Sequence, residues 1–143
     1  MVQMRHLGVY GLIIEDEKIL LVKKCKGAYT GKYDLPGGSI EYGEKPIETL
    51  KRELQEETNT EIKKAVLFDA NSVVVEWIHH EEDESLHHIG IIYEVSLINN
   101  QVKEDADGHD SLGAVWIPIK DLTKDNISPL TYEALKKKGY KIN

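Results

Sequence analysis

The segment 38–60 reads GSIEYGEKPIETLKRELQEETNT, and its most acidic part, RELQEE, places Glu53, Glu56 and Glu57 within about one turn of an expected helix. Carboxylates three and four residues apart on a helix repel each other, and each such pair costs a few tenths of a kcal/mol. A surface helix would more naturally mix positive and negative side chains. The pattern therefore indicates that a cation from outside the sequence completes this cluster.

The same segment predicts the bounds of the helix. Pro46 suits the first helical position, because the N–H that proline lacks would have no helical partner there. We expect the helix to run to about Thr58 and to end at Asn59, since asparagine tolerates the left-handed conformation. Three apolar residues at spacings of three and four form the side that packs inward, namely Ile47, Leu50 and Leu54. At 100° per residue, the carboxylates form a stripe beside that apolar side.

The flanking sequence predicts strands around this helix. Apolar and β-branched runs predict strands at 6–14, 18–24, 61–80, 84–97 and 113–119. The first two form a hairpin, the two long ones are joined through the acidic EEDE segment, and LPGG forms a turn. A short helix or turn is expected at KDLTKD. Ser128 as N-cap, Pro129 in the first turn and Gly139 beyond a lysine run predict a C-terminal helix. We therefore expect an α/β sandwich with a mixed sheet.

Length and composition narrow the classes of function. At 143 residues the chain is expected to form one domain, 1–143. The net charge of −7 argues against a nucleic-acid or anionic-membrane partner. It allows a small phosphorylated ligand, because a bound divalent cation reverses the local charge. One cysteine, Cys25, excludes an internal disulfide and indicates a reducing compartment. With no pattern for a signal peptide or a membrane span, we expect a cytoplasmic protein.

The acidic cluster has a specific chemical interpretation. Three carboxylates at the edge of a packed helix face form a hard, oxygen-rich site that suits Mg²⁺ or Mn²⁺. Arg52 lies four residues from Glu48 and from Glu56, so it can brace one carboxylate by a bidentate pair. The glycines before the helix let backbone carbonyls approach the same ion. The alternative for an isolated E-x-x-E-E pattern is a solvated acidic helix face.

The pattern is not isolated, because it resembles the signature of the Nudix (MutT-like) hydrolase family. In that signature, G-x5-E-x7-R-E-U-x-E-E-x-G-U, U is an aliphatic residue. The positions that match are Gly38, Glu44, Arg52, Glu53, Leu54, Glu56 and Glu57. The preceding YDLPGG also resembles the usual lead-in of the family. Asn59 replaces a glycine and Thr60 an aliphatic residue, and neither departure touches a carboxylate.

The resemblance implies a fold and an activity. The fold is an α/β/α sandwich with a mixed sheet between helices, and the activity is metal-dependent hydrolysis of a nucleoside diphosphate linked to another moiety. At the matching positions, the resemblance implies that Gly38, Glu53, Glu56 and Glu57 hold Mg²⁺ or Mn²⁺. Arg52 orients Glu56 or a neighbour, and Glu44 supports the loop–helix junction or a water molecule that lies behind the direct metal ligands. A non-catalytic nucleotide sensor and a structural Ca²⁺-binding domain are the alternatives, and a homodimer stays open.

Residues outside the signature are candidates for binding the rest of the substrate. Lys23 and Lys24 end a predicted strand near the glycine turn and can pair with phosphates, although solvated lysines are an equal alternative. Tyr33, Phe68 and Trp77 can stack on a base, although burial trends favour packing in the core for each.

Three further features of the sequence bear on the chemistry of the site. The pairs His79-His80 and His87-His88 suggest a transition-metal site, but adjacent strand residues point to opposite faces. Asp110, in an acidic loop before the strand at 113–119, is our candidate for a base or an additional ligand. Cys25 has no histidine partner in the sequence pattern, so we expect no thiol nucleophile.

Overall fold

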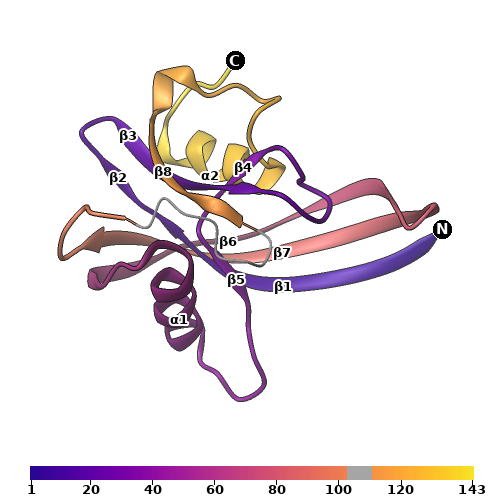
Figure 1. Cartoon of the computed structure of the whole chain (residues 1–143), viewed down its shortest axis with the longest axis horizontal. Coiled ribbons are helices and arrows are strands. Elements are labelled where there is room, and N and C mark those ends of the chain that lie inside the picture. Colours follow the sequence, from indigo (N-terminus) through magenta and orange to yellow (C-terminus); the bar gives the residue numbers. More distant parts are fainter. Residues whose placement is uncertain (103–110) are drawn as a thin grey trace.

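The computed structural model describes residues 1–102 and 111–143, with the side chains of residues 111 and 112 excepted. Two helices lie on opposite sides of the strands (Figure 1). The elements in chain order are β1 (Val2–Leu12), β2 (Ile14–Glu15), β3 (Lys18–Lys24), β4 (Tyr33–Asp34), β5 (Gly37–Ser39), α1 (Pro46–Thr58), β6 (Ile62–His79), β7 (Glu82–Leu97), β8 (Ser111–Pro118), the 3₁₀ turn η1 (Ile119–Asp121) and α2 (Pro129–Lys138).

The strands form two sheets, and the chain passes from one to the other between β1 and β2. The larger sheet has the order β5-β1-β7-β6, and only β1 and β7 run parallel. In the smaller, antiparallel sheet β3 pairs with β2, β4 and β8. The prediction of an α/β sandwich with a mixed sheet and two helices is confirmed. The strands divide between two sheets, however, and only the larger sheet is mixed.

The core has two halves, one under each helix. Adjacent strand residues point to opposite faces, so Leu20 packs with Leu54 of α1, and Leu21 packs with Leu135 of α2. All four of these side chains are fully buried. The strands therefore lie between α1 and α2, and β3 contributes side chains to both halves.

Both helices begin and end where the sequence indicates. α1 starts at Pro46 and ends at Asn59, which has φ 55° and ψ 41°, the left-handed conformation expected there. The Ser128 side chain accepts a hydrogen bond from the Thr131 N–H at the start of α2, and Gly139 ends this helix with φ 107°. Among the described residues, no helix combines the length and the apolar character needed to cross a membrane.

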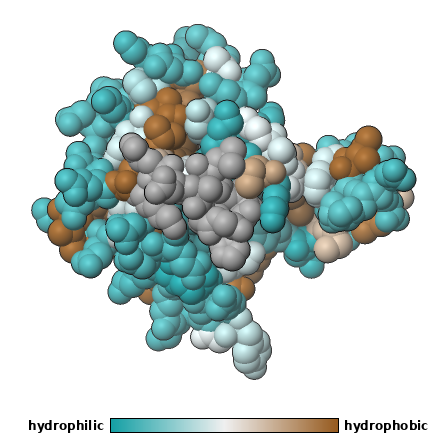
Figure 2. All heavy atoms as spheres, viewed as in Figure 1, coloured by the Kyte–Doolittle hydropathy of each residue, from teal (hydrophilic) through white to brown (hydrophobic). Residues whose placement is uncertain are grey.

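The hairpin between β6 and β7 differs from the prediction. It turns at His80 and Glu81, which have φ 50° and 65°, while His79 already pairs with Glu82. The expected EEDE connection is wrong, because a two-residue turn with two positive φ angles matches the twist of the flanking strands. The hairpin projects beside the N-terminal end of β1, and Figure 2 shows both apolar and polar side chains on this projection. The short strands β4 and β5 lie where the sequence indicated only loop and turn.

Candidate active site

The strand β5 and the helix α1 meet at two consecutive glycines. The Gly37 N–H donates a hydrogen bond of 2.7 Å to Oε1 of Glu57, a carboxylate that is only 3% exposed. A Cβ added at Gly38 would lie 2.7 Å from the Glu53 carboxylate. Gly37 has φ 145°, and a Cβ there would collide with the backbone of β1. Glycine at these two positions therefore allows β5 to lie close to β1 on one side and to the acidic helix face on the other.

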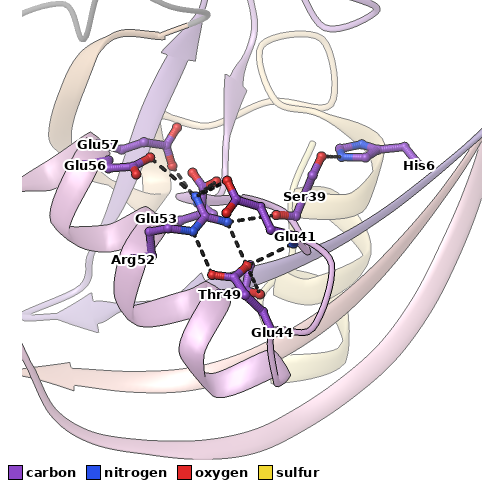
Figure 3. Close-up of polar contacts among 10 residues, drawn as sticks. His6, Ser39, Glu41, Glu44, Thr49, Arg52, Glu53, Glu56 and Glu57 are labelled. Carbon is purple, nitrogen blue, oxygen red and sulfur yellow. Dashed lines mark hydrogen bonds and ion pairs between the residues drawn. The ribbon is translucent and has the colours of Figure 1, made fainter.

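Arg52 lies at the centre of the polar contacts in Figure 3. Its Nε and Nη2 donate to the two carboxylate oxygens of Glu44 at 2.8 and 3.0 Å, which is a bidentate pair. Nη1 donates to Glu53 at 2.9 Å and to Glu56 at 3.5 Å. Nη2 also donates to the Ser39 backbone oxygen at 3.1 Å. The Glu44 carboxylate, with Glu53 beside it, raises the pKa of Arg52 further, so this side chain stays charged.

Glu44 ties the loop before α1 to the helix. Besides Arg52, it accepts hydrogen bonds from the Thr49 hydroxyl at 2.8 Å and from the Glu41 N–H at 2.9 Å. The hydrogen bonds from Arg52, followed by the one from Glu41, lower the pKa of Glu44 to about 2. We expected Arg52 to form a bidentate pair with Glu48 or Glu56. Its bidentate partner is Glu44 instead, Glu56 receives a single contact of 3.5 Å, and Glu48 accepts a hydrogen bond from the Lys45 N–H. Arg52 therefore links the loop to Glu53.

Arg52 and Glu53 line one side of a cavity of about 490 Å³. The lining on this side comes from β5, the following loop and α1: Gly37, Gly38, Ser39, Glu41, Arg52, Glu53, Glu56 and Glu57. The rest comes from the strands and the loop after β3: His6, Tyr10, Lys24, Lys26, Gly27, Ala28, Tyr29, Asp34, Trp77, Glu84, Leu86 and His88. One cavity therefore brings the acidic cluster together with lysines and with an indole ring.

Some of the candidates for substrate binding lie at the cavity and others lie away from it. Lys24 and Trp77 line the cavity, whereas Lys23 and Tyr33 do not. The Lys23 ammonium lies 5.2 Å from the centre of the Tyr33 ring, a cation–π contact, and Tyr33 packs against the core under α2. The placement of Lys23 and Tyr33 gives no support to a role in binding. Asp110 lies outside the residues that the structure describes.

Trp77 is held at the cavity by its neighbours on the hairpin. Its indole N–H donates to the Glu84 carboxylate at 3.2 Å, and the same carboxylate lies 3.0 Å from Nδ1 of His79. The His79 ring stacks on the indole at 4.7 Å and 15°. His80 lies in the turn, and the centres of the His79 and His80 rings are 4.2 Å apart. These two rings therefore lie together and do not, as we had expected, point to opposite faces of a strand.

A buried polar cluster around His88 forms one end of the cavity. The sequence analysis did not identify this cluster. His88, 1% exposed, has the Tyr10 hydroxyl 2.6 Å from Nε2 and the Tyr29 hydroxyl 2.7 Å from Nδ1. His6 stacks on it at 4.9 Å. Burial, followed by the charges of His6 and Lys24, lowers the pKa of His88 to about 4, so its ring is neutral at pH 7. The sequence held one signal for this cluster. Side chains alternate between the two faces of β7, so His88 and His87 point to opposite faces.

Asp34 is a second buried titratable group in this cavity. Its Oδ1 accepts hydrogen bonds from the Leu35 N–H, from Ser128 at 2.6 Å and from Thr131 at 3.3 Å. Burial nevertheless raises the pKa of Asp34, against the opposing effect of Lys24. Its contacts run to the first turn of α2, so this carboxylate connects the cavity wall to the second helix.

The acidic cluster fits a divalent cation in its donor chemistry. Carboxylate oxygens are the ligands that Mg²⁺ prefers, and Gly38 leaves open the space beside Glu53 that a side chain would fill. Among residues 1–102 and 111–143, no three His, Cys, Asp or Glu side chains are grouped so that they could hold a metal ion as they stand. Arg52 contacts Glu53 and Glu56, and Gly37 contacts Glu57, so each carboxylate has a protein donor.

Comparison with known proteins gives consistent relatives. The NUDIX domain model matches residues 4–137. An ADP-ribose pyrophosphatase of Methanocaldococcus jannaschii is 30% identical over 82% of this chain, which spans 64% of the length of that protein. The nucleoside triphosphatase NudI of Escherichia coli O139:H28 is 28% identical, with 90% of this chain and 92% of NudI aligned.

Solved structures show the same fold. The MutT protein from Methanosarcina mazei Go1 superposes with a TM-score of 0.66 at 20% identity, covering 96% of this chain and 94% of that protein. The NUDIX domain of Shewanella oneidensis NrtR, complexed with ADP ribose, gives 0.62 at 16% identity, covering 94% and 86%. Since the family model covers nearly the whole chain and the signature residues Glu53, Glu56 and Glu57 line the cavity of the candidate site, the chain belongs to the Nudix hydrolase family.

Proposed function

We propose that this protein is a Mg²⁺-dependent pyrophosphohydrolase whose substrate is a nucleoside diphosphate linked to another moiety, such as a nucleoside triphosphate or a nucleotide sugar. Hydrolysis of a diphosphate bond follows from membership of the family. The observation that carries the proposal is the single cavity in which the acidic cluster, Lys24 and Trp77 lie together. Cations pair with phosphates, and an indole ring stacks on a base.

We assign a role to each of the signature residues in the site. Gly38, Glu53, Glu56 and Glu57 would hold Mg²⁺, with Mn²⁺ as the alternative ion. When bound, the ion neutralises phosphate charge and acidifies the attacking water. Arg52 keeps Glu53 in place, and Glu44 orients Arg52 through the bidentate pair.

The names of the relatives support the substrate class. The Methanocaldococcus jannaschii relative is named for ADP-ribose and the Escherichia coli relative for nucleoside triphosphates. Both kinds of compound contain a nucleoside attached to a diphosphate. We propose a cytoplasmic location on the basis of the single Cys25, which suits a reducing compartment. The homodimer stays a prediction, which sedimentation equilibrium would check.

Turnover on a substrate panel tests the proposal. Nucleoside triphosphates, nucleotide sugars, ADP-ribose and dinucleotide polyphosphates would be incubated with the protein in Mg²⁺, in Mn²⁺ and in EDTA. We expect hydrolysis of at least one compound with either ion and none in EDTA. Tight binding of a compound without turnover would instead support a non-catalytic sensor. Stabilisation by Ca²⁺ alone, with no hydrolysis, would support a structural domain.

A further inference from the structure

Three glycines on neighbouring strands make room for one aromatic side chain. Gly8 of β1, Gly37 of β5 and Gly90 of β7 all face Tyr10. A Cβ added at Gly37 would lie 2.7 Å from the Tyr10 Cα, and one at Gly90 would lie 3.3 Å from its ring. Tyr10 also pairs with Gly37 in the register of β1 and β5. The position of this ring is therefore coupled to the position of the first residue of β5.

His88 contacts the two residues that hold the ends of β5. Its Nε2 is hydrogen-bonded to Tyr10, which packs on Gly37. Its ring stacks on His6, whose Nε2 is hydrogen-bonded to the Ser39 hydroxyl at 2.6 Å (Figure 3). One contact is a hydrogen bond to Tyr10 and the other is a stacking contact with His6, and both lead to the same three-residue strand, β5. His88 thereby acts on both ends of β5 from inside the fold.

β5 in turn holds the acidic face of α1. Gly37 donates its N–H to Glu57, and Ser39 accepts a hydrogen bond from Arg52 through its backbone oxygen. Gly38, between them, lies against the Glu53 carboxylate. A small displacement of this short strand would change all three contacts together.

We propose that His88 is a positioning residue for the acidic cluster, which acts through Tyr10 and His6 on β5 and through β5 on Glu57 and Arg52. The inference rests on the proposed function, because it takes Glu57 as a metal ligand. Hydrogen bonds fix the orientation of a ring, whereas an apolar side chain in this place would only fill space. A buried polar cluster whose members are all bonded is suited to define one geometry.

The test compares two tyrosines that bond to the same imidazole. Tyr10→Phe removes the hydroxyl on the side of β5, and Tyr29→Phe removes the hydroxyl on the other nitrogen. The Mg²⁺ dissociation constant would be measured without substrate, from the dependence of the melting temperature on Mg²⁺ concentration. Hydrogen exchange of the Gly37 amide would be followed by NMR in EDTA, as a report on the hydrogen bond to Glu57.

We expect Tyr10→Phe to weaken Mg²⁺ binding about tenfold or more, which is the usual effect of losing a residue that supports a metal ligand. Exchange of the Gly37 amide should also become faster. Tyr29→Phe leaves the contacts of Tyr10 and His6 with β5 in place, so it should lower the melting temperature but change the dissociation constant and the exchange rate much less than Tyr10→Phe does. Should Tyr10→Phe not fold, His88→Gln receives the same measurements with the same expectation.

Three outcomes would overturn the inference. Tyr10→Phe could bind Mg²⁺ and exchange at Gly37 as the wild type does. Tyr29→Phe could change both quantities as much as Tyr10→Phe, which would mean that general loss of stability is the cause. A wild type whose melting temperature does not respond to Mg²⁺ or Mn²⁺ would overturn the proposed function, and this inference with it. Only the first two outcomes leave the proposed function standing.

Discussion

At the scale of single residues, glutamate side chains lie in three different environments in the site. Glu44 accepts hydrogen bonds from three different residues in the loop–helix junction. Glu57 is buried and accepts a hydrogen bond from the Gly37 N–H, and the Glu56 side chain is 56% exposed. A carboxylate with strong internal partners is suited to holding structure, and an exposed one can exchange its partners. Glu44 is also not part of the cavity lining, whereas Glu53, Glu56 and Glu57 line the cavity, and this placement separates Glu44 from the carboxylates proposed to bind metal.

The first prediction concerns catalysis by Glu53. Glu53→Gln keeps the size of the side chain but removes the charge that we assign to metal binding. We expect kcat with Mg²⁺ to fall by at least ~10²-fold, as is typical when a major electrostatic element is lost, while KM changes less. Steady-state kinetics on the best compound of the panel measures both. Near-normal turnover in this variant would show that Glu53 is not a metal ligand.

The second prediction concerns the pH dependence of stability at His88. Because burial lowers its pKa to about 4, the unfolded chain takes up this proton more readily than the folded protein does. The contribution of neutral His88 to stability is complete above the unfolded pKa of about 6.5 and is lost as pH falls toward 4. At about 1.4 kcal/mol per pKa unit, the loss amounts to about 3 kcal/mol.

Melting temperatures of the wild type and of His88→Gln between pH 4 and 7.5 check this prediction. The wild type should lose stability across this interval, and the variant should lose clearly less, since its amide does not titrate. Parallel curves for the two proteins would show that other groups cause the acid sensitivity.

At the scale of elements, α1 has an unusual distribution of charge. Its last turn has no basic residue, although cations at a helix C-terminus interact favourably with the helix dipole. Glu56 and Glu57 lie close to this end, where their charges oppose the dipole, and each repels Glu53, which lies three or four residues earlier. The helix is nevertheless well packed, with Leu50 and Leu54 fully buried. Packing therefore stabilises a helix whose charges favour the binding of a cation.

The third prediction follows from this arrangement. Glu57→Gln can still accept the hydrogen bond from Gly37, and it removes a buried charge. In EDTA the variant should be as stable as the wild type, or more stable by a few tenths of a kcal/mol. In Mg²⁺ at a hundred times its dissociation constant, the wild type should gain about 2.7 kcal/mol, and the variant should gain much less.

Thermal melting of both proteins in EDTA and in millimolar Mg²⁺ measures this crossover. A variant already weaker by several kcal/mol in EDTA would show that Glu57 holds the fold together. In that case we would no longer assign it as a metal ligand.

The fourth prediction belongs to the β6–β7 hairpin. Trp77 is fixed by Glu84 and His79 at the cavity, and it belongs to neither half of the core. Trp77→Ala should therefore raise KM strongly for a substrate with an aromatic base and only slightly for inorganic triphosphate. Kinetics on the two compounds, with melting temperature as a control, checks the assignment. Equal losses on both compounds, together with a lower melting temperature, would mean that Trp77 has a structural role.

At the scale of the whole molecule, the two halves of the core depend on the same strands. β3 places Leu20 under α1 and Leu21 under α2, so neither half can form without ordering the strand that the other needs. The cavity is built in the same way, from α1, β5 and the larger sheet together with the loop after β3. We expect the fold to be lost in a single step.

The fifth prediction tests this coupling. Leu54→Ala on the side of α1 and Leu135→Ala on the side of α2 should each lower the free energy of unfolding by about 2–5 kcal/mol. Urea unfolding would be followed by far-UV circular dichroism and by tryptophan fluorescence. The two signals should give one coincident transition in each variant. Separate midpoints in either variant would show that the halves of the core unfold independently.

The sequence by itself determined the features that depend on short stretches of chain. The bounds of α1 and α2, the inward side of Leu50 and Leu54 and the acidic stripe all follow from a repeat of 3.6 residues and from local capping. The spacing of the signature also identified the family, since its charged positions lie within 20 residues of one another. These predictions needed no knowledge of distant contacts.

Tertiary structure alone decided how the rest of the cavity is assembled. Tyr10, Tyr29 and His88 come from distant parts of the chain, and no local pattern records that their side chains meet. The strands β4 and β5 are too short for a periodic signal, and they form because longer strands offer them backbone partners. The register of β6 and β7 places Trp77 at the cavity instead of in the core. Periodicity indicates which face a side chain occupies, whereas the pairing of strands decides what lies opposite that face.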